Sequence, residues 1–190
     1  MNKKKNLTAE ETFALAVENQ KKNNFQIAEN LYKEILKTNP NHFKSIFYLG
    51  TLLAQTKKFN LAKLLLHKAI QIQPNYAIAY NNLGNVLKEL GEHQKAISSY
   101  EKAITIQPND AMAHYNLGNV LKELGQFQNA ISSYKKAIQI QPNYTIAYNN
   151  LGNLLKELGE FQNAKINFIS LQKGFGLEQI KNFKHKIMNK

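Results

Sequence analysis

Asparagine side chains recur on one face of the predicted helices, and they are the residues whose type and spacing best suit a binding site. In the segment 111–124, Asn116, Asn119 and Glu123 are spaced three and four residues apart, which places them on one helical stripe with Lys122 beside it. A carboxamide carries both hydrogen-bond donors and an acceptor. A row of such groups is suited to holding the backbone of an extended peptide with little regard to its sequence.

The same stripe recurs at equal intervals before and after this segment. The predicted surface comprises Asn82, Asn85, Lys88, Glu89, Asn116, Asn119, Lys122, Glu123, Asn150, Asn153, Lys156 and Glu157. Stacking of equivalent segments is expected to align the asparagines in two parallel rows. The first row is Asn82, Asn116 and Asn150, and the second is Asn85, Asn119 and Asn153. A second explanation stays open, because near-identical segments would also carry a neutral asparagine copied with everything else.

No other pattern of residues predicts chemistry. The chain has no cysteine, so disulfides, thiol chemistry and cysteine zinc sites are excluded. The five histidines are scattered without a metal-ligand spacing. No glycine-rich phosphate loop occurs, and no nucleophile, base and orienting group share a motif. We therefore expect no catalytic residue, no metal site and no cofactor, and a chain that is not an enzyme.

A 34-residue period organises the chain that must position these side chains. The interval between successive prolines is the same throughout, as the numbers of Pro40, Pro74, Pro108 and Pro142 show. The segments 77–110 and 111–144 agree at 25 of 34 positions without a gap. A fixed period in the range of about 20 to 50 residues is typical of a stacked array.

Each repeat is predicted to be a pair of helices. In the fourth repeat, apolar residues recur at helical spacing over 111–124 and again over 127–141. Gly125 lies between the two runs, Pro142 ends the second, and Asn143 is the expected N-cap of the next helix. Gly118 stands in mid-helix at a cost of roughly 1 kcal/mol relative to alanine, which predicts close approach of another helix. Tyr134 is expected to fill the space between two alanines there.

The repeat resembles the tetratricopeptide repeat (TPR). The matching residues of the fourth repeat are Leu117, Gly118, Leu121, Ala130, Tyr134, Ala137 and Pro142. The resemblance implies an all-α fold, a right-handed superhelix in which the first helix of each pair lines a concave groove. The repeats would span 9–42, 43–76, 77–110, 111–144 and 145–178. The sequence motif Leu-Gly-Asn-x-Leu-Lys-Glu-Leu-Gly is similar to the repeat region of O-linked N-acetylglucosamine transferases, in which an asparagine row holds acceptor polypeptides.

The two ends of the chain depart from the repeat pattern. Residues 1–8 are predicted to be a disordered basic tail. Residues 179–190 are predicted to form a C-terminal capping helix and basic tail, because Leu177, Ile180, Phe183 and Ile187 fall at roughly helical spacing. An amphipathic helix that binds a membrane or a partner is the alternative for this segment.

The net charge of +12 raises the question of nucleic-acid binding. All 25 basic residues are lysine, so the bidentate contacts that arginine makes to phosphates and bases are missing. Residues 77–144 carry six lysines and five acids, so the most regular repeats are almost neutral. The sequence therefore argues against nucleic acid as a partner. No apolar run approaches the ~18 residues of a membrane span, and no apolar secretion core follows the N-terminal lysines, so we expect a cytoplasmic protein.

Three functions remain from the sequence. The first is a non-catalytic scaffold that binds a protein or peptide in the asparagine-lined groove. The second is the substrate-recruiting region of a modifying enzyme, such as a glycosyltransferase, whose catalytic domain is not in this chain. The third is a weak nucleic-acid binder. Nothing in the sequence fixes the oligomeric state.

Overall fold

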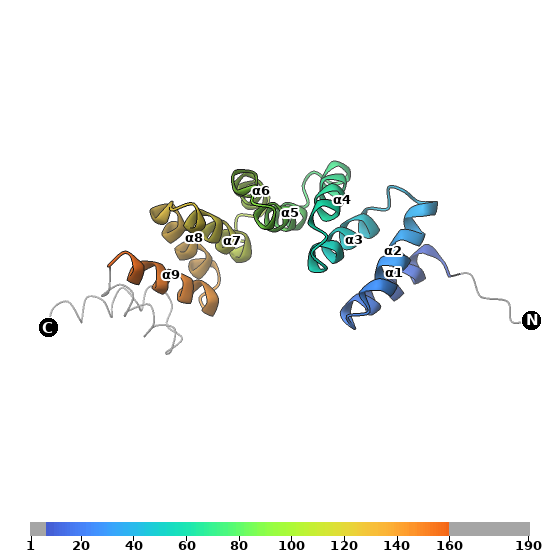
Figure 1. Cartoon of the computed structure of the whole chain (residues 1–190), viewed down its shortest axis with the longest axis horizontal. Helices are drawn as coiled ribbons and strands as arrows, with labels where there is room; N and C mark the ends of the chain where they lie inside the picture. The colour runs from blue at the N-terminus through green and yellow to red at the C-terminus, as the bar shows by residue number, and fades with distance from the viewer. Residues whose placement is uncertain (1–6, 160–190) are drawn as a thin grey trace, which may run out of the picture. The chain divides into compact units, whose positions relative to one another are not determined.

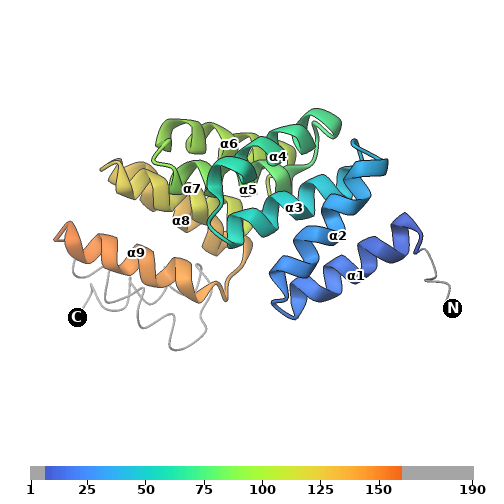
Figure 2. The ribbon, with the colours of Figure 1, turned by 45° about the vertical axis from the view of Figure 1, so that its right-hand side comes forward.

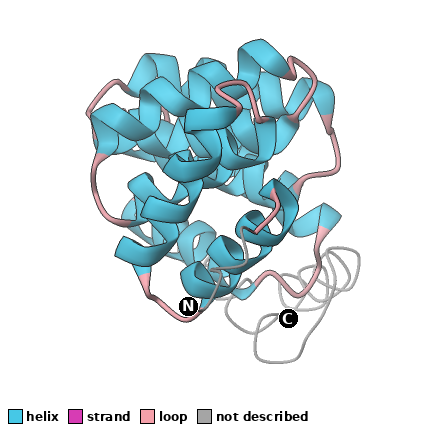
Figure 3. Ribbon diagram, turned by 90° about the vertical axis from the view of Figure 1, so that its right-hand side faces the viewer, coloured by secondary structure: helices cyan, strands magenta, loops and turns pink. Residues whose placement is uncertain are grey.

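The structure, a computed structural model, describes residues 7–159, and its regular secondary structure in that range is entirely helical (Figure 1). Colouring by secondary structure shows helices and loops but no strand among these residues (Figure 3). The helices are α1 (Ala9–Lys21), α2 (Phe25–Thr38), α3 (Phe43–Gln55), α4 (Phe59–Ile72), α5 (Ala77–Glu89), α6 (His93–Ile106), α7 (Ala111–Glu123), α8 (Phe127–Ile140) and α9 (Thr145–Glu157). The predicted all-α class is confirmed. The predicted second helix of the fifth repeat, the predicted helix at 179–190 and residues 1–6 of the predicted disordered tail lie outside the described residues. The prediction is wrong for Thr8, which is the N-cap of α1.

The chain divides into two compact units. The first unit is residues 1–92 and contains α1 to α5; the second is residues 93–190, of which 93–159 are described and contain α6 to α9. The division falls inside the third predicted repeat, so the two helices of that repeat belong to different units.

The first unit is a run of helices in which each packs on the next. Helices α1 and α2 form one pair and α3 and α4 a second, while α3 also touches α1 and α5 (Figure 2). The connections between these helices are only three or four residues long, which makes neighbouring helices antiparallel. Tyr32, Ile46, Leu52 and Leu66 are completely buried and form the centre of this core.

Two ion pairs of opposite polarity join neighbouring repeats in the first unit. Glu29 on α2, whose side chain is 8% exposed, accepts hydrogen bonds from Lys33 at 2.6 Å and from Lys58 at 2.8 Å. One repeat later, Lys63 on α4 donates to Glu92 at 2.7 Å. Glu29 and Lys63 occupy equivalent positions of successive repeats, and so do Lys58 and Glu92. The carboxylate and the ammonium group therefore exchange places between the two interfaces.

In the second unit, α7 packs on both α6 and α8, and α9 packs on α8 (Figure 1). Gly118 on α7 faces the ring of Tyr134 on α8. A Cβ added to this glycine would lie 2.7 Å from two atoms of the ring, which is closer than side chains tolerate. Ala130 and Ala137, on either side of Tyr134, are completely buried. The predicted close approach at Gly118 is confirmed.

A left-handed residue follows the first helix of each repeat. Gly91, Gly125 and Gly159 have φ angles of 74°, 72° and 78°. Asn23 and Lys57 stand at the equivalent places in the first two repeats, with φ angles of 62° and 60°. Glycine adopts this conformation freely, whereas a side chain brings its Cβ close to the following carbonyl oxygen.

The N-caps of the first helices differ from repeat to repeat. Asp110 caps α7, since its side chain accepts hydrogen bonds from the backbone amides of Met112 and Ala113 at 2.9 and 3.2 Å. The prediction that Asn143 is the N-cap of α9 is wrong. Tyr144 occupies that position and makes no side-chain cap, because the repeat equivalent of Asp110 is the residue after Asn143.

Candidate functional site

The predicted surface residues of the second unit lie on α7 and α9, and these two helices meet through them. Asn116 and Asn119 are half-buried on α7, while Asn150 is half-buried and Asn153 exposed on α9. The side-chain amide of Asn150 donates a hydrogen bond to Oδ1 of Asn119 at 2.9 Å. The contact joins a residue of the first predicted row to one of the second, because facing residues on α7 and α9 are offset from exact repeat positions.

Two tyrosines extend this contact into a network. The hydroxyl of Tyr134 on α8 donates to the same Oδ1 of Asn119 at 2.8 Å. Asn150 donates a further hydrogen bond from Nδ2 to the hydroxyl oxygen of Tyr115 at 3.1 Å. The rings of Tyr115 and Tyr134 are tilted against each other with centroids 6.0 Å apart. We call Tyr115, Asn119, Tyr134 and Asn150 the tyrosine–asparagine network.

Tyr134 remains a hydrogen-bond donor at any ordinary pH. Burial is the main cause that raises the pKa of Tyr134 above its ordinary value of 10.0, and the neighbouring Tyr115 raises it further. The side-chain amide of Asn150 near the hydroxyl acts in the opposite direction and lowers the pKa. Because the ring is completely buried, its O–H depends on a protein acceptor, and Asn119 supplies it.

The predicted surface omits Tyr115 and the hydroxyl of Tyr134. For Tyr134 the sequence does contain a signal: phenylalanine would fill the same space, so a tyrosine at a fully buried position requires a partner for its hydroxyl. The repeat pattern alone does not say which residue that partner is.

Charged and apolar side chains border the asparagines. Lys122 and Glu157 approach to 3.6 Å between α7 and α9, and both are partly exposed, so the pair adds little stability. Glu123 on α7 is exposed and Lys156 on α9 is exposed. Met112 and Ile146 lie four residues before Asn116 and Asn150, and these two residues are 55% and 48% exposed. The surface therefore combines amides with two accessible apolar side chains.

In the first unit, the predicted residues lie along α5. Asn82, Asn85 and Lys88 are half-buried, and Glu89 is exposed. The ammonium group of Lys88 lies 3.6 Å from a carboxylate oxygen of Glu89. Helix α3, which touches α5, carries no asparagine in its sequence, so within this unit the asparagine stripe is confined to α5.

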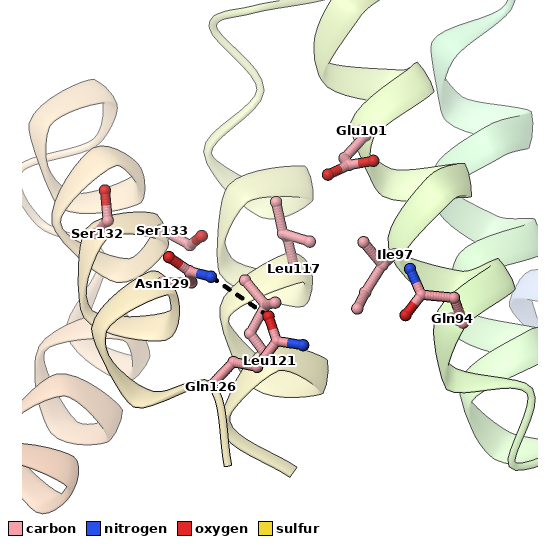
Figure 4. A pocket seen from close by; sticks show the side chains of 9 residues that line it. All are labelled: Gln94, Ile97, Glu101, Leu117, Leu121, Gln126, Asn129, Ser132 and Ser133. Carbon is pink, nitrogen blue, oxygen red and sulfur yellow. Dashed lines mark hydrogen bonds between the residues drawn. The ribbon is translucent and has the colours of Figure 1, made fainter. Parts of the chain in front are cut away.

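A separate cavity of about 360 Å³ lies in the second unit between α6, α7 and α8 (Figure 4). Leu117 and Leu121 of α7 project into it from the side of the helix opposite Asn116 and Asn119. The other lining residues are Gln94, Ile97, Glu101, Gln126, Asn129, Ser132 and Ser133. This cavity is distinct from the asparagine surface, and its lining has no nucleophile paired with a base.

Two further properties bear on functions that the asparagines do not supply. Within residues 7–159, no group of three or more histidine, cysteine or acidic side chains is placed to hold a metal ion. None of the helices in the same range is long and apolar enough to cross a membrane.

Comparison with known proteins identifies the repeats. Models described as "TPR repeat" and "Tetratricopeptide repeat" match residues 13–77, 65–98, 84–125 and 118–159. No curated protein gives a significant match.

Several solved structures share the fold. A MamA protein is 28% identical, with a TM-score of 0.78 over 87% of this chain and 91% of that one. PilF of Pseudomonas aeruginosa is 19% identical, with a TM-score of 0.79 over 88% of this chain and 77% of that one. YrrB, described as a TPR protein with an unusual peptide-binding site, is 18% identical, with a TM-score of 0.70 over 94% of this chain and 92% of that one. From the family matches over residues 13–159, supported by these folds, the chain is a member of the tetratricopeptide repeat proteins.

Proposed function

We propose that this chain is a non-catalytic scaffold that binds an extended polypeptide along the asparagine surface of α7 and α9. The TPR fold is typical of protein–protein interaction. The observation that carries the proposal is the hydrogen bond between Asn119 and Asn150, because it holds two amides of different helices side by side on one partly exposed surface. Asn82 and Asn85 offer the same groups on α5 of the first unit.

The chemistry of the surface suits a polypeptide backbone. Each peptide group carries one donor and one acceptor, and an amide side chain can satisfy both. Met112 and Ile146 offer apolar contacts to side chains of the ligand beside these amides. Because backbone groups are the same at every residue, recognition of this kind tolerates many ligand sequences. The described peptide-binding site of YrrB supports the capacity of this fold for peptides.

The proposal is tested with Asn116→Ala combined with Asn153→Ala, since neither residue belongs to the tyrosine–asparagine network. The probe is a fluorescein-labelled dodecapeptide of alternating threonine and serine with blocked ends, which is neutral and favours an extended chain. Each lost amide contact should cost about 0.5–1.5 kcal/mol. The double substitution should therefore weaken binding about tenfold, at about 1.4 kcal/mol per decade, measured by fluorescence anisotropy.

The matched control is Asn129→Ala, which removes an asparagine at the separate cavity on the other side of α7. It should leave the affinity of the peptide unchanged. An equal loss of affinity in both proteins would contradict the proposed surface. Absence of binding by the wild-type chain at millimolar peptide would contradict backbone recognition itself.

A second candidate is the substrate-recruiting region of a modifying enzyme. The recurring Leu-Gly-Asn motif, which is similar to the repeats of O-linked N-acetylglucosamine transferases, favours this candidate. Co-purification of the chain with a glycosyltransferase would support this candidate over a free-standing scaffold. Weak nucleic-acid binding through lysines is the third candidate, and the salt dependence described below tests it.

A further inference from the structure

The tyrosine–asparagine network leaves only one end of each amide available for a ligand. Oδ1 of Asn119 accepts two hydrogen bonds, from Tyr134 and from Asn150, which occupies both of its lone pairs. Nδ2 of Asn150 donates two hydrogen bonds, to Asn119 and to Tyr115, which uses both of its hydrogens. What remains is the NH₂ group of Asn119 and the carbonyl oxygen of Asn150.

Both remaining groups are accessible. Neither has a hydrogen-bond partner among residues 7–159, and the buried polar side-chain atoms without a partner in that range are limited to Nδ1 of His93. Because the NH₂ group of Asn119 and the carbonyl oxygen of Asn150 are not among these buried atoms, both are reached by solvent. Both side chains are half-buried, so a ligand that lies along α7 and α9 meets a donor at Asn119 and an acceptor at Asn150.

The reverse arrangement would be equivalent were it not for Tyr134. If both amides turned over, Asn119 would donate to Asn150 and to the oxygen of Tyr134, and Tyr115 would donate to Asn150. Tyr115 is half-buried and can exchange its roles with the help of water. The hydroxyl of Tyr134 would lose its 2.8 Å hydrogen bond to Asn119 at a fully buried position, which is unfavourable.

We propose that Tyr134 is a positioning residue that fixes the polarity of this amide pair and thereby the chemistry of the ligand. The ligand group is a secondary amide of a polypeptide backbone: its carbonyl accepts from Asn119 and its N–H donates to Asn150. A peptide bond that precedes proline has no N–H and does not satisfy the site. This inference rests on the proposed function and adds to it a direction of binding and a selection against proline.

The test compares Tyr134→Phe with one matched substitution, using the threonine–serine dodecapeptide. Tyr134→Phe should weaken the binding of this peptide about fivefold to tenfold, because the amide pair no longer has a fixed polarity. Tyr32→Phe removes a buried hydroxyl at the equivalent position of the first repeat, where the partner is Gln20. It controls for the general loss of stability and should not affect binding.

A polyproline dodecapeptide, which is extended but has no backbone N–H groups, should bind at least tenfold more weakly than the threonine–serine peptide. In addition, NMR of the wild-type side chains should show that the peptide shifts the NH₂ signals of Asn119 and leaves those of Asn150 slow to exchange with solvent. A merely structural role of Tyr134 would not produce this asymmetry.

The outcomes separate the two proposals. If Asn116→Ala with Asn153→Ala weakens binding but Tyr134→Phe does not, the surface is correct and the positioning role is wrong. If polyproline binds as well as the threonine–serine peptide, Asn150 is not an acceptor for backbone N–H, which also overturns the inference. If the asparagine substitutions have no effect, the proposed function itself fails.

Discussion

Burial and hydrogen bonding shift the pKa of the Glu29 carboxylate in opposite directions. Its residue is 6% exposed, and burial alone would raise its pKa. Hydrogen bonds from Lys33 and then Lys58 outweigh that effect and lower the pKa below its ordinary value of 4.5. The folded state therefore favours the charged carboxylate more than the unfolded state does, so Glu29 contributes stability at neutral pH.

Glu29→Gln tests this contribution. Because the folded pKa is lowered, the stabilisation is fully present above the unfolded pKa and disappears as the pH falls through the folded pKa. We expect Glu29→Gln to reduce the free energy of unfolding at pH 7, and the difference from wild type to shrink below about pH 4. Urea unfolding followed by circular dichroism at several pH values measures it.

Glu34→Gln is the control on the same helix, because Glu34 is exposed and forms no ion pair in the part of the chain that the structure describes. It should change stability little at either pH. If Glu29→Gln lowers the free energy of unfolding equally at every pH, Glu29 acts through packing rather than through its charge.

The residues of the candidate site were predictable from the sequence only in part. The 34-residue spacing predicts the asparagines, since a period places equivalent residues on equivalent helix faces. The spacing does not reveal that Asn150 bonds to Asn119, because that contact depends on the offset between α7 and α9. The role of the Tyr134 hydroxyl depends on three helices together, and no pattern within one helix encodes it.

Among the helices, the α7–α8 and α3–α4 pairs use the same glycine position with different partners. Gly118 faces the flat ring of Tyr134, and a Cβ added to this glycine would lie 2.7 Å from two ring atoms. Gly50 faces the branched side chain of Leu66, where the added Cβ would lie 3.2 Å from Cγ. A leucine side chain can shift by a few tenths of an ångström more easily than a tyrosine ring that is also hydrogen-bonded.

Replacement of each glycine by alanine should therefore give different results. Alanine gains roughly 1 kcal/mol in helix propensity at either position. At Gly118, overpacking against Tyr134 should outweigh the gain and leave a net loss of about 1–3 kcal/mol. At Gly50 the two effects should nearly cancel. Chemical denaturation of Gly118→Ala and Gly50→Ala measures both, and equal midpoints would mean that the Tyr134 ring yields freely.

The helices themselves were largely predictable. The predicted runs 111–124 and 127–141 each end one residue beyond α7 and α8, because the final residue of each run is the C-cap. Apolar periodicity and the glycine and proline signals are local, so they set these bounds. The caps were less predictable, as Tyr144 shows, since a helix held by packing does not require a capping side chain.

At the scale of the whole molecule, the charge is its most unusual property. The net charge of +12 comes entirely from lysine. In the described residues, Lys58, Lys63 and Lys122 lie next to carboxylates rather than standing alone. Lysines that already have acidic neighbours offer less to a phosphate backbone, although net positive charge still attracts polyanions over a distance.

Binding to nucleic acid should accordingly be weak and strongly dependent on salt. We expect that any affinity for a labelled DNA duplex at about 50 mM salt falls steeply by about 200 mM, with no preference among duplex sequences. Binding of the neutral threonine–serine peptide should hardly change over the same range. Tight, sequence-selective DNA binding at physiological salt would make nucleic acid the leading partner.

The reversed polarity of the two ion pairs in the first unit bears on how such a chain can change in length. Repeats of similar sequence are prone to duplication and loss by unequal recombination. A second copy of 43–76 inserted after the first would set Lys63 against a new Lys58, and deletion of that repeat would set Glu29 against Glu92. Either event keeps the helical pattern intact but places like charges in contact at a partly buried junction, which is unfavourable. The opposite polarity of these two ion pairs therefore disfavours both duplication and loss of the second repeat.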